Sequence, residues 1–138
     1  MGKHPWKLGF FTQGGISETF TYTSCITGYS SDKPEYHSKL FNNSDGTFTA
    51  RLKDQTEYLF DTNFLLTAMR DKNGNTISYV YDIAGKITSI KDSQNHGISV
   101  LYNSQGVITS IADWAGRSVK YGYDTQGNLI SVSDPIGA

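Results

Sequence analysis

A repeat of 21 residues constrains the fold of this chain more than any other feature of its sequence. Residues 67–129 divide without gaps into three blocks, 67–87, 88–108 and 109–129, and a fourth block begins at residue 130 and runs to residue 138. Equivalent positions carry chemically similar side chains, as in the column Tyr81, Tyr102 and Tyr123. Many agreeing columns at one fixed period indicate a repeat architecture, in which each block is one structural unit that stacks on its neighbours.

Each block is predicted to contain two β-strands. The segment 77–81 alternates strictly and places Ile77, Tyr79 and Tyr81 on one face, and segments 98–102 and 119–123 repeat this pattern. In the second strand of each block the apolar residues lie three apart, as Ile87 and Ile90 do. This spacing breaks strict alternation, so we interpret it as a β-bulge or as a strand with two apolar faces.

Turns of the form Asp-x-x-Gly separate these strands. The Asp carboxylate accepts a hydrogen bond from the backbone N–H two residues later, and Gly supplies the positive φ that closes the turn. Asn95 replaces Gly in one copy, and Asn enters this region of φ more readily than most residues. Short turns between short strands predict an antiparallel meander. The predicted structural turn residues are Asp71, Gly74, Asp82, Gly85, Asp92, Gly106, Asp113, Gly116, Asp124, Gly127, Asp134 and Gly137.

The pattern continues upstream in weaker form. Residues 40–66 are predicted as a divergent β-hairpin or repeat unit, in which residues 42–46 form the turn and Tyr58-Leu59-Phe60-Asp61 matches the strand end Tyr79-Val80-Tyr81-Asp82. Residues 1–39 are predicted as an irregular β leader with a hairpin over 6–23 and a loop over 24–38. The expected organisation is therefore all-β, with segments 1–39, 40–66 and 67–138 and no helix.

These repeats resemble the RHS/YD-repeat family, which is named after its Tyr-Asp pair. The residues that carry the resemblance are Tyr81-Asp82, Gly85 to Asp92, Gly106 to Asp113, Gly116-Arg117 and Tyr123-Asp124. The second block departs from the family pattern, with Tyr102-Asn103 in place of Tyr-Asp and Asn95-His96 in place of Gly-Arg. The resemblance is strong over residues 67–138, fair over 40–66 and almost absent from 1–39.

The resemblance implies that this chain is a piece of a larger secreted, injected or cell-surface protein. Repeat arrays of this family wind into a β-sheet shell that encloses a toxin domain in bacterial polymorphic toxins, and related repeats build the extracellular barrel of the teneurins. The implied partners are the remaining repeats and the cargo domain of the same longer chain. The curled or twisted sheet of this fragment would keep an open edge, through which we expect copies to self-associate.

Charge and composition exclude several classes of function. The chain has 12 basic and 13 acidic residues, a net charge of −1, which argues against a surface that neutralises nucleic-acid phosphates. No apolar run approaches the roughly 20 residues of a membrane-spanning helix, so we expect no membrane insertion. Cys25 is the sole cysteine, which excludes a disulfide framework within the chain and a zinc site built on cysteines.

The acidic and histidine residues do not form a convincing catalytic or metal site. Equivalent Asp turns of successive repeats are expected about 10 Å apart, whereas calcium holds its oxygen ligands at about 2.3–2.6 Å, which favours turn capping over a ladder of metal ions. Asp92, Ser93 and His96 lie in one turn, where a preorganised catalytic triad is not expected. We predict no catalytic residue, no metal site and no cofactor.

Trp114 is the one candidate for a ligand contact. It occupies a turn position that holds Lys72, Ser93 and Pro135 in the other blocks, and an exposed Trp in a turn is a better contact residue than a Tyr in a buried strand face. Two functions remain open. The first is a non-catalytic scaffold, a fragment of a β-shell that encloses or presents a toxin or other cargo. The alternative is an adhesion module that binds a carbohydrate or a cell-surface receptor.

Overall fold

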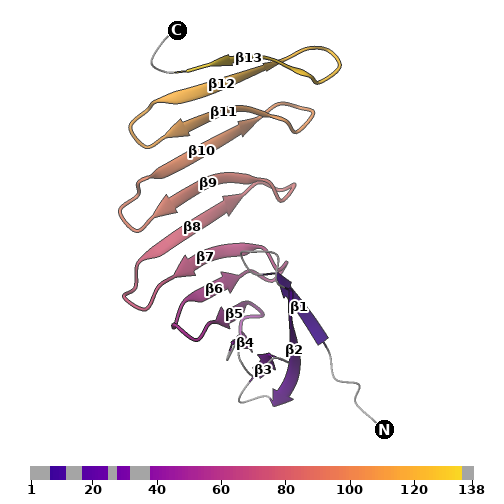
Figure 1. Cartoon of the computed structure of the whole chain (residues 1–138), viewed down its shortest axis with the longest axis vertical. Helices are drawn as coiled ribbons and strands as arrows, with labels where there is room; N and C mark the ends of the chain where they lie inside the picture. The colour runs from indigo at the N-terminus through magenta and orange to yellow at the C-terminus, as the bar shows by residue number, and fades with distance from the viewer. Residues whose placement is uncertain (1–6, 12–16, 25–27, 32–37, 135–138) are drawn as a thin grey trace. The chain divides into compact units, whose positions relative to one another are not determined.

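The computed structural model describes residues 7–11, 17–24, 28–31 and 38–134, with side chains from residue 38 onward. The chain divides into two compact units, residues 1–75 and residues 76–138. Figure 1 shows the strands of both units. The first unit holds β1 (Lys7–Phe11), β2 (Ser17–Ser24), β3 (Gly28–Ser31), β4 (Lys39–Asn42), β5 (Phe48–Arg51), β6 (Glu57–Phe60) and β7 (Leu66–Arg70). The second unit holds β8 (Thr76–Tyr81), β9 (Ile87–Asp92), β10 (Gly97–Tyr102), β11 (Ile108–Asp113), β12 (Ser118–Tyr123) and β13 (Leu129–Ser133).

Each unit is an antiparallel meander. In the first unit every strand from β1 to β7 pairs with the next along the chain. The same holds from β8 to β13 in the second unit, and β13 lies at an edge of the sheet. The structure contains no helix within the described ranges, and therefore none there that could span a membrane. The predicted all-β meander is confirmed.

The two upstream hairpins are confirmed where the structure describes them. β1 and β2 pair with Leu8 opposite Phe20, although the turn between them lies outside the described residues. β4 and β5 flank a turn in which Gly46 has a φ of 83°.

The predicted loop over residues 24–38 is wrong at β3. This strand pairs with β2 on one side and with β4 on the other. Its sequence, Gly-Tyr-Ser-Ser, carries little β-propensity of its own, and neighbours on both sides supply the backbone partners that stabilise it. Residues 32–37 lie outside the described ranges.

The first unit has a small buried core on β4 and β5. Leu40 and Ala50 lie directly opposite each other and are almost fully buried, at 1% and 0% exposure. Phe48, Tyr58 and Phe60 are partly buried and pack against this pair. This core lies on β4 and β5, whose sequences match the repeat pattern only weakly.

From β6 onward, a β-bulge occurs in the second strand of each pair that is joined by the turn after a Tyr or Phe strand end. Between β8 and β9, Val80 pairs with Ser89 but Tyr81 pairs with Ile87, so Thr88 is the extra residue. The same shift occurs between β6 and β7, between β10 and β11, and between β12 and β13. The extra residue restores Ile87 and Ile90 to one face, which is the physical reason for the three-residue spacing. Of the two interpretations of this spacing, a bulge or a strand with two apolar faces, the structure shows the bulge.

The side chains at the bulge complete its hydrogen bonding. The Thr88 hydroxyl donates to the Val80 carbonyl at 3.2 Å, and Thr109 makes the equivalent bond to Leu101 at 3.3 Å. Successive repeats are joined just before the bulge, where the Tyr102 hydroxyl donates to the Ile87 carbonyl at 2.8 Å. Tyr123 repeats this bond to Ile108 at 2.7 Å. The tyrosine at this position therefore locks the second repeat to the first and the third repeat to the second.

Replacement of Tyr102 by Phe tests this lock. The variant keeps the ring but leaves the Ile87 carbonyl without its donor, so we expect a loss of about 1 kcal/mol of unfolding free energy, measured by urea denaturation. Tyr121→Phe is the matched control, because no hydrogen bond of the Tyr121 hydroxyl is found among the described residues. Equal losses in the two variants would contradict the lock.

Candidate functional site

The Asp turns use their carboxylates to hold backbone N–H groups. In the turn after β7, Asp71 Oδ1 accepts from the N–H of Asn73 at 2.8 Å and from the N–H of Asn75 at 2.9 Å. The Gly74 N–H donates to the Asp71 carbonyl at 3.1 Å, and the Asp71 N–H donates to the Asn75 carbonyl at 2.9 Å. This is a tight turn followed by a left-handed residue, a common way to close a hairpin. Oδ1 accepts the same two backbone N–H bonds in Asp82, Asp92, Asp113 and Asp124.

The fourth residue of each turn has a positive φ. It is glycine in most turns, with φ values of 88° at Gly74, 77° at Gly85, 79° at Gly106, 86° at Gly116 and 85° at Gly127. Asn95 takes the position in the turn after β9, with a φ of 63°. Asp134 is exposed, and Gly137 lies outside the described residues.

Several turn residues are missing from the predicted set, although two of them align with its Asp column. Asp61 caps the turn after β6, whose left-handed residue is Phe64 at a φ of 64° rather than glycine. The Phe64 ring stacks on Phe48 with centroids 4.7 Å apart, and this contact helps to offset the strain of a bulky residue in that conformation. Asn103 replaces Asp in the turn after β10, where its Oδ1 accepts two backbone N–H bonds at 3.0 Å. Their alignment to the Asp column was the available signal.

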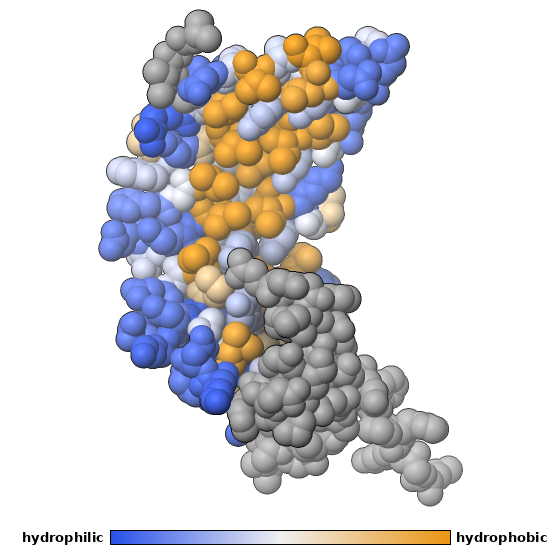
Figure 2. All heavy atoms as spheres, viewed as in Figure 1, coloured by the Kyte–Doolittle hydropathy of each residue, from blue (hydrophilic) through white to orange (hydrophobic). Residues whose placement is uncertain are grey.

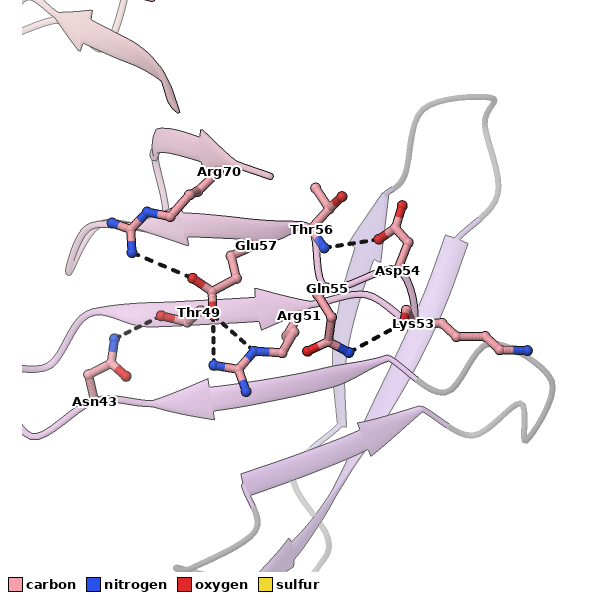
Figure 3. A network of polar contacts seen from close by, with 9 residues as sticks. All are labelled: Asn43, Thr49, Arg51, Lys53, Asp54, Gln55, Thr56, Glu57 and Arg70. Carbon is pink, nitrogen blue, oxygen red and sulfur yellow. Dashed lines mark hydrogen bonds and ion pairs between the residues drawn. The ribbon is translucent and has the colours of Figure 1, made fainter. Parts of the chain in front are cut away.

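A polar network covers one face of β5, β6 and β7 (Figure 3). Glu57 accepts from Arg51 Nη2 at 2.7 Å and lies 3.7 Å from Arg70 Nη1. On the neighbouring turn, the Thr56 N–H donates to Asp54 Oδ1 at 2.9 Å. The side chains of Arg51 and Arg70 are 44% and 47% exposed, whereas that of Glu57 is 18% exposed. Ion pairs with exposed partners favour the strand register more than they add stability.

In the turn after β9, Asp92 and His96 make contacts other than those of a catalytic triad. His96 Nδ1 lies 3.7 Å from Asp92 Oδ2, while Asp92 Oδ1 accepts from the N–H groups of Gln94 and His96. The imidazole packs against the Trp114 ring instead, with ring centroids 4.2 Å apart. Among the residues described, no three His, Cys, Asp or Glu side chains gather as metal ligands.

Trp114 lies in the turn after β11 and is 63% exposed. Its backbone N–H donates to the Gly97 carbonyl at 2.9 Å, which ties this turn to the start of β10. A pocket of about 300 Å³ lies beside it, at the ends of β9, β10 and β11. The turns after β9 and β11 lie at the same end of the strands (Figure 1). The pocket is lined by Ser89, Lys91, Asn95, Gly97, Ile98, Ser99, Asp113 and Trp114.

The second unit presents one continuous apolar face, visible as an orange band over its strands in Figure 2. Strand register places Tyr79 opposite Ile90, Ile90 opposite Ile98 and Val100 opposite Ile111. Val100 is buried at 7% exposure, but Val132 remains 58% exposed. We call this set the apolar face: Ile77, Tyr79, Tyr81, Ile87, Ile90, Ile98, Val100, Tyr102, Ile108, Ile111, Val119, Tyr121, Tyr123, Leu129 and Val132.

Hydrogen bonds in the turns lower the pKa of several Asp carboxyls. The Asn75 side-chain amide is the main cause at Asp71, and the Asn128 amide is the main cause at Asp124. At Asp113 desolvation raises the pKa, but bonds from the Arg117 guanidinium and backbone outweigh it and leave the pKa lowered. Each carboxylate is therefore held more firmly in its charged form than in the unfolded chain.

Stability is expected to fall in acid for this reason. A lowered pKa contributes stability above the unfolded value of about 4, and this stability is lost as the pH falls through the folded value. The Asp124→Asn variant preserves the turn, because Asn103 already fills the equivalent position, but it removes the titration. We expect its urea midpoint to fall less than that of the parent between about pH 6 and pH 2.5. An equal fall would contradict the contribution of Asp124.

The positive φ of Gly106 provides a second test. Gly106→Val is expected to lose about 1–3 kcal/mol of unfolding free energy in thermal or urea melts, because a β-branched residue is strained at a φ of 79°. An added Cβ meets only the Nζ end of the flexible Lys86 side chain, so the backbone strain dominates. Gly127→Val, at a φ of 85° with no atom within 4 Å of an added Cβ, is expected to lose a similar amount. An unchanged melting temperature in either variant would refute the turn.

The comparisons with known proteins agree with this geometry. The family model for the teneurin YD-shell matches residues 35–135, which is more than half of the chain. A search of the curated proteins found no match. The predicted resemblance to the RHS/YD-repeat family is confirmed. Proteins of this family are extracellular or associated with the cell surface. The locked two-strand repeats, their Asp turns and this match together show that the chain belongs to the teneurin YD-shell family.

Proposed function

We propose that this chain is a non-catalytic segment of a β-shell that encloses or presents a cargo, such as a toxin domain, in a secreted, injected or cell-surface protein. The apolar face of the second unit is the observation that carries this proposal. The opposite face is more polar, with residues such as Ser78, Lys91 and Lys120, although Val80 and Leu101 also lie on it and are exposed. A sheet with one apolar face is stable in water only when another layer covers that face.

The strands of the second unit do not supply that cover. Ile98, Leu129 and Val132 of the apolar face remain 38%, 53% and 58% exposed, respectively. Contiguous apolar surface of this kind is typical of an interaction surface. In the proposed shell, the covering layer is the cargo domain or a further run of repeats from the same chain.

The hydrogen-bonded locks suit a mechanical role. The Tyr102 and Tyr123 hydroxyls join successive repeats through the backbone, and the Asp turns fix both ends of each hairpin. Side chains that serve as locks and caps are occupied with structural bonds. A wall built in this way resists opening between repeats.

Site-specific photo-crosslinking tests the covering layer. A benzophenone amino acid replaces Tyr121, which lies on the apolar face, or Lys120, which lies on the opposite face and is exposed. The protein is expressed from its whole gene, and cross-linked peptides are identified by mass spectrometry. We expect position 121 to cross-link to a cargo domain or to further repeats, and position 120 to give few or no such cross-links.

Other crosslinking results would contradict the proposal. Cross-links from position 121 that reach only residues 1–39 of this chain, or only a second copy of it, would contradict the shell. The same contacts from both positions would show that the apolar face does not select the partner.

The edge strand β13 is proposed as a site of self-association for the isolated chain. Leu129, Ile130 and Val132 of this strand are exposed, and an exposed edge strand can pair with another chain.

A further inference from the structure

One asparagine of the chain is followed directly by glycine, and it lies in the turn after β7. The sequence has eight asparagines, and only Asn73 precedes a glycine. In the glycine turns described for the second unit, the same position holds alanine or glutamine, as in Ala115-Gly116 and Gln126-Gly127. Because asparagine is a chemically labile residue, this substitution in the turn column has a chemical consequence.

The Asn73-Gly74 pair can close a five-membered ring on itself. The backbone nitrogen of Gly74 attacks Asn73 Cγ, loses its proton and expels the side-chain nitrogen as ammonia, which leaves a succinimide. Glycine favours this step because it has no Cβ to crowd the attacking nitrogen, and outside its chain neighbours no heavy atom lies within 4 Å of a Cβ built at Gly74. Glutamine in this position would need a larger ring, and alanine has no amide to lose.

The Asn73 amide is available for the reaction. Asn73 is exposed, and its side chain makes no hydrogen bond among the residues that the structure describes. Asn75 lies in the same turn and is the opposite case. Its side-chain nitrogen donates to Asp71 Oδ2 at 2.7 Å, and the branched Thr76 follows it in the chain. Exposure of the turn alone therefore does not make an asparagine reactive.

The single Asp-Gly pair of the chain is protected in another way. The Asp45 carboxylate accepts from the Thr47 hydroxyl at 2.7 Å and from the Thr47 N–H at 3.0 Å, and these bonds lower the pKa of Asp45. A carboxylate that stays ionised is a poor target for a nucleophile. Asn73 has no such protection, because its amide is neutral at any physiological pH.

The closed turn opposes ring closure at Asn73. The Gly74 N–H donates to the Asp71 carbonyl at 3.1 Å, and the Asn73 N–H donates to Asp71 Oδ1 at 2.8 Å. The Gly74 nitrogen must turn away from the Asp71 carbonyl before it attacks Asn73 Cγ, so the turn has to open first. The negative charge of Asp71 also opposes loss of the proton from the Gly74 nitrogen.

We propose that Asn73 is a site of intramolecular deamidation and that Asp71 limits its rate by keeping the turn closed. Water then opens the succinimide at one of its two carbonyl groups. Cleavage of the bond between Cγ and the Gly74 nitrogen gives aspartate. Cleavage of the bond between the main-chain carbonyl carbon and that nitrogen gives isoaspartate, whose main chain runs through Cβ and Cγ. Either product carries a carboxylate in place of the neutral amide.

The isoaspartate product changes the geometry of the turn. It lengthens the main chain by one carbon inside a turn that is closed by the bond from the Asp71 N–H to the Asn75 carbonyl at 2.9 Å. The first unit ends at residue 75 and the second begins at residue 76, so the modification falls in the segment where the chain divides. This site is independent of the shell role, since neither its residues nor its test involves the apolar face.

Peptide mapping of the whole chain by mass spectrometry tests the proposal. The protein is incubated in mildly alkaline buffer made with heavy-oxygen water, so that each hydrolysed succinimide gains a labelled oxygen. We expect label at residue 73 to appear about tenfold or more faster than at any other asparagine. Labelling should be slower in mildly acidic buffer, because the attacking nitrogen must lose its proton. Methylation by an isoaspartyl methyltransferase identifies the isoaspartate fraction.

A second turn of the same type allows the site to be transplanted. Ala115 precedes Gly116 in the turn after β11, and its N–H donates to Asp113 Oδ1 as the Asn73 N–H does to Asp71. Ala115→Asn should create a second labelled site, whereas Ala115→Gln should not. Asn73→Gln should abolish labelling at residue 73.

A further pair of variants tests the role of Asp71. Asp71→Ala removes the carboxylate that holds the turn, so labelling of Asn73 should rise about threefold or more. Asp92→Ala removes the same carboxylate from the turn of the next repeat and should leave the rate at Asn73 unchanged.

Three results would overturn the proposal. Label appears at residue 73 no faster than at Asn75. Ala115→Asn remains unlabelled at residue 115, which would show that an Asn-Gly pair in this turn does not react. Asp71→Ala leaves the rate unchanged or alters it no more than Asp92→Ala does, which would remove Asp71 as the residue that limits the reaction.

Discussion

The five-residue turn, closed by a carboxylate and a residue of positive φ, is the constraint on which the rest of the structure depends. Asp71 illustrates it: the carboxylate holds two backbone N–H groups, and Gly74 turns the chain back into the next strand. Because this turn recurs at both ends of short strands, the strands can form only a meander. The bulge and the tyrosine lock then set how each hairpin meets the one before it.

The same constraint leaves the second unit with an exposed apolar face. A meander of short hairpins buries its backbone through the ladder but gives its side chains no opposing layer. Val100 is the single hydrophobic side chain buried there among the residues described, and Val132 is 58% exposed. Such a sheet is suited to be one wall of a larger body. This is why we propose a scaffold role for it.

Much of the fold was predictable from the sequence because the repeat made local signals agree. The all-β meander, the hairpin of β4 and β5 and the bulge near Thr88 all followed from the spacing of apolar residues and from turn chemistry. Other features were not predictable. β3 has a weak strand sequence and exists through its two neighbours, and Phe64 enters a left-handed conformation that Phe rarely adopts but here stacks on Phe48. The predicted segments 1–39, 40–66 and 67–138 stay predictions.

The sequence by itself determined the period, the strands and the residues that close the turns, because these depend on local backbone geometry and on alternation along the chain. It also identified Trp114 as an unusual residue in its column. Only the tertiary structure decided what Trp114 meets: the His96 ring from the equivalent turn of the preceding repeat, the Gly97 carbonyl and a pocket that Ser89 helps to line. These contacts join different strands, and the distance between residues on different strands depends on register and bulges that no single repeat specifies.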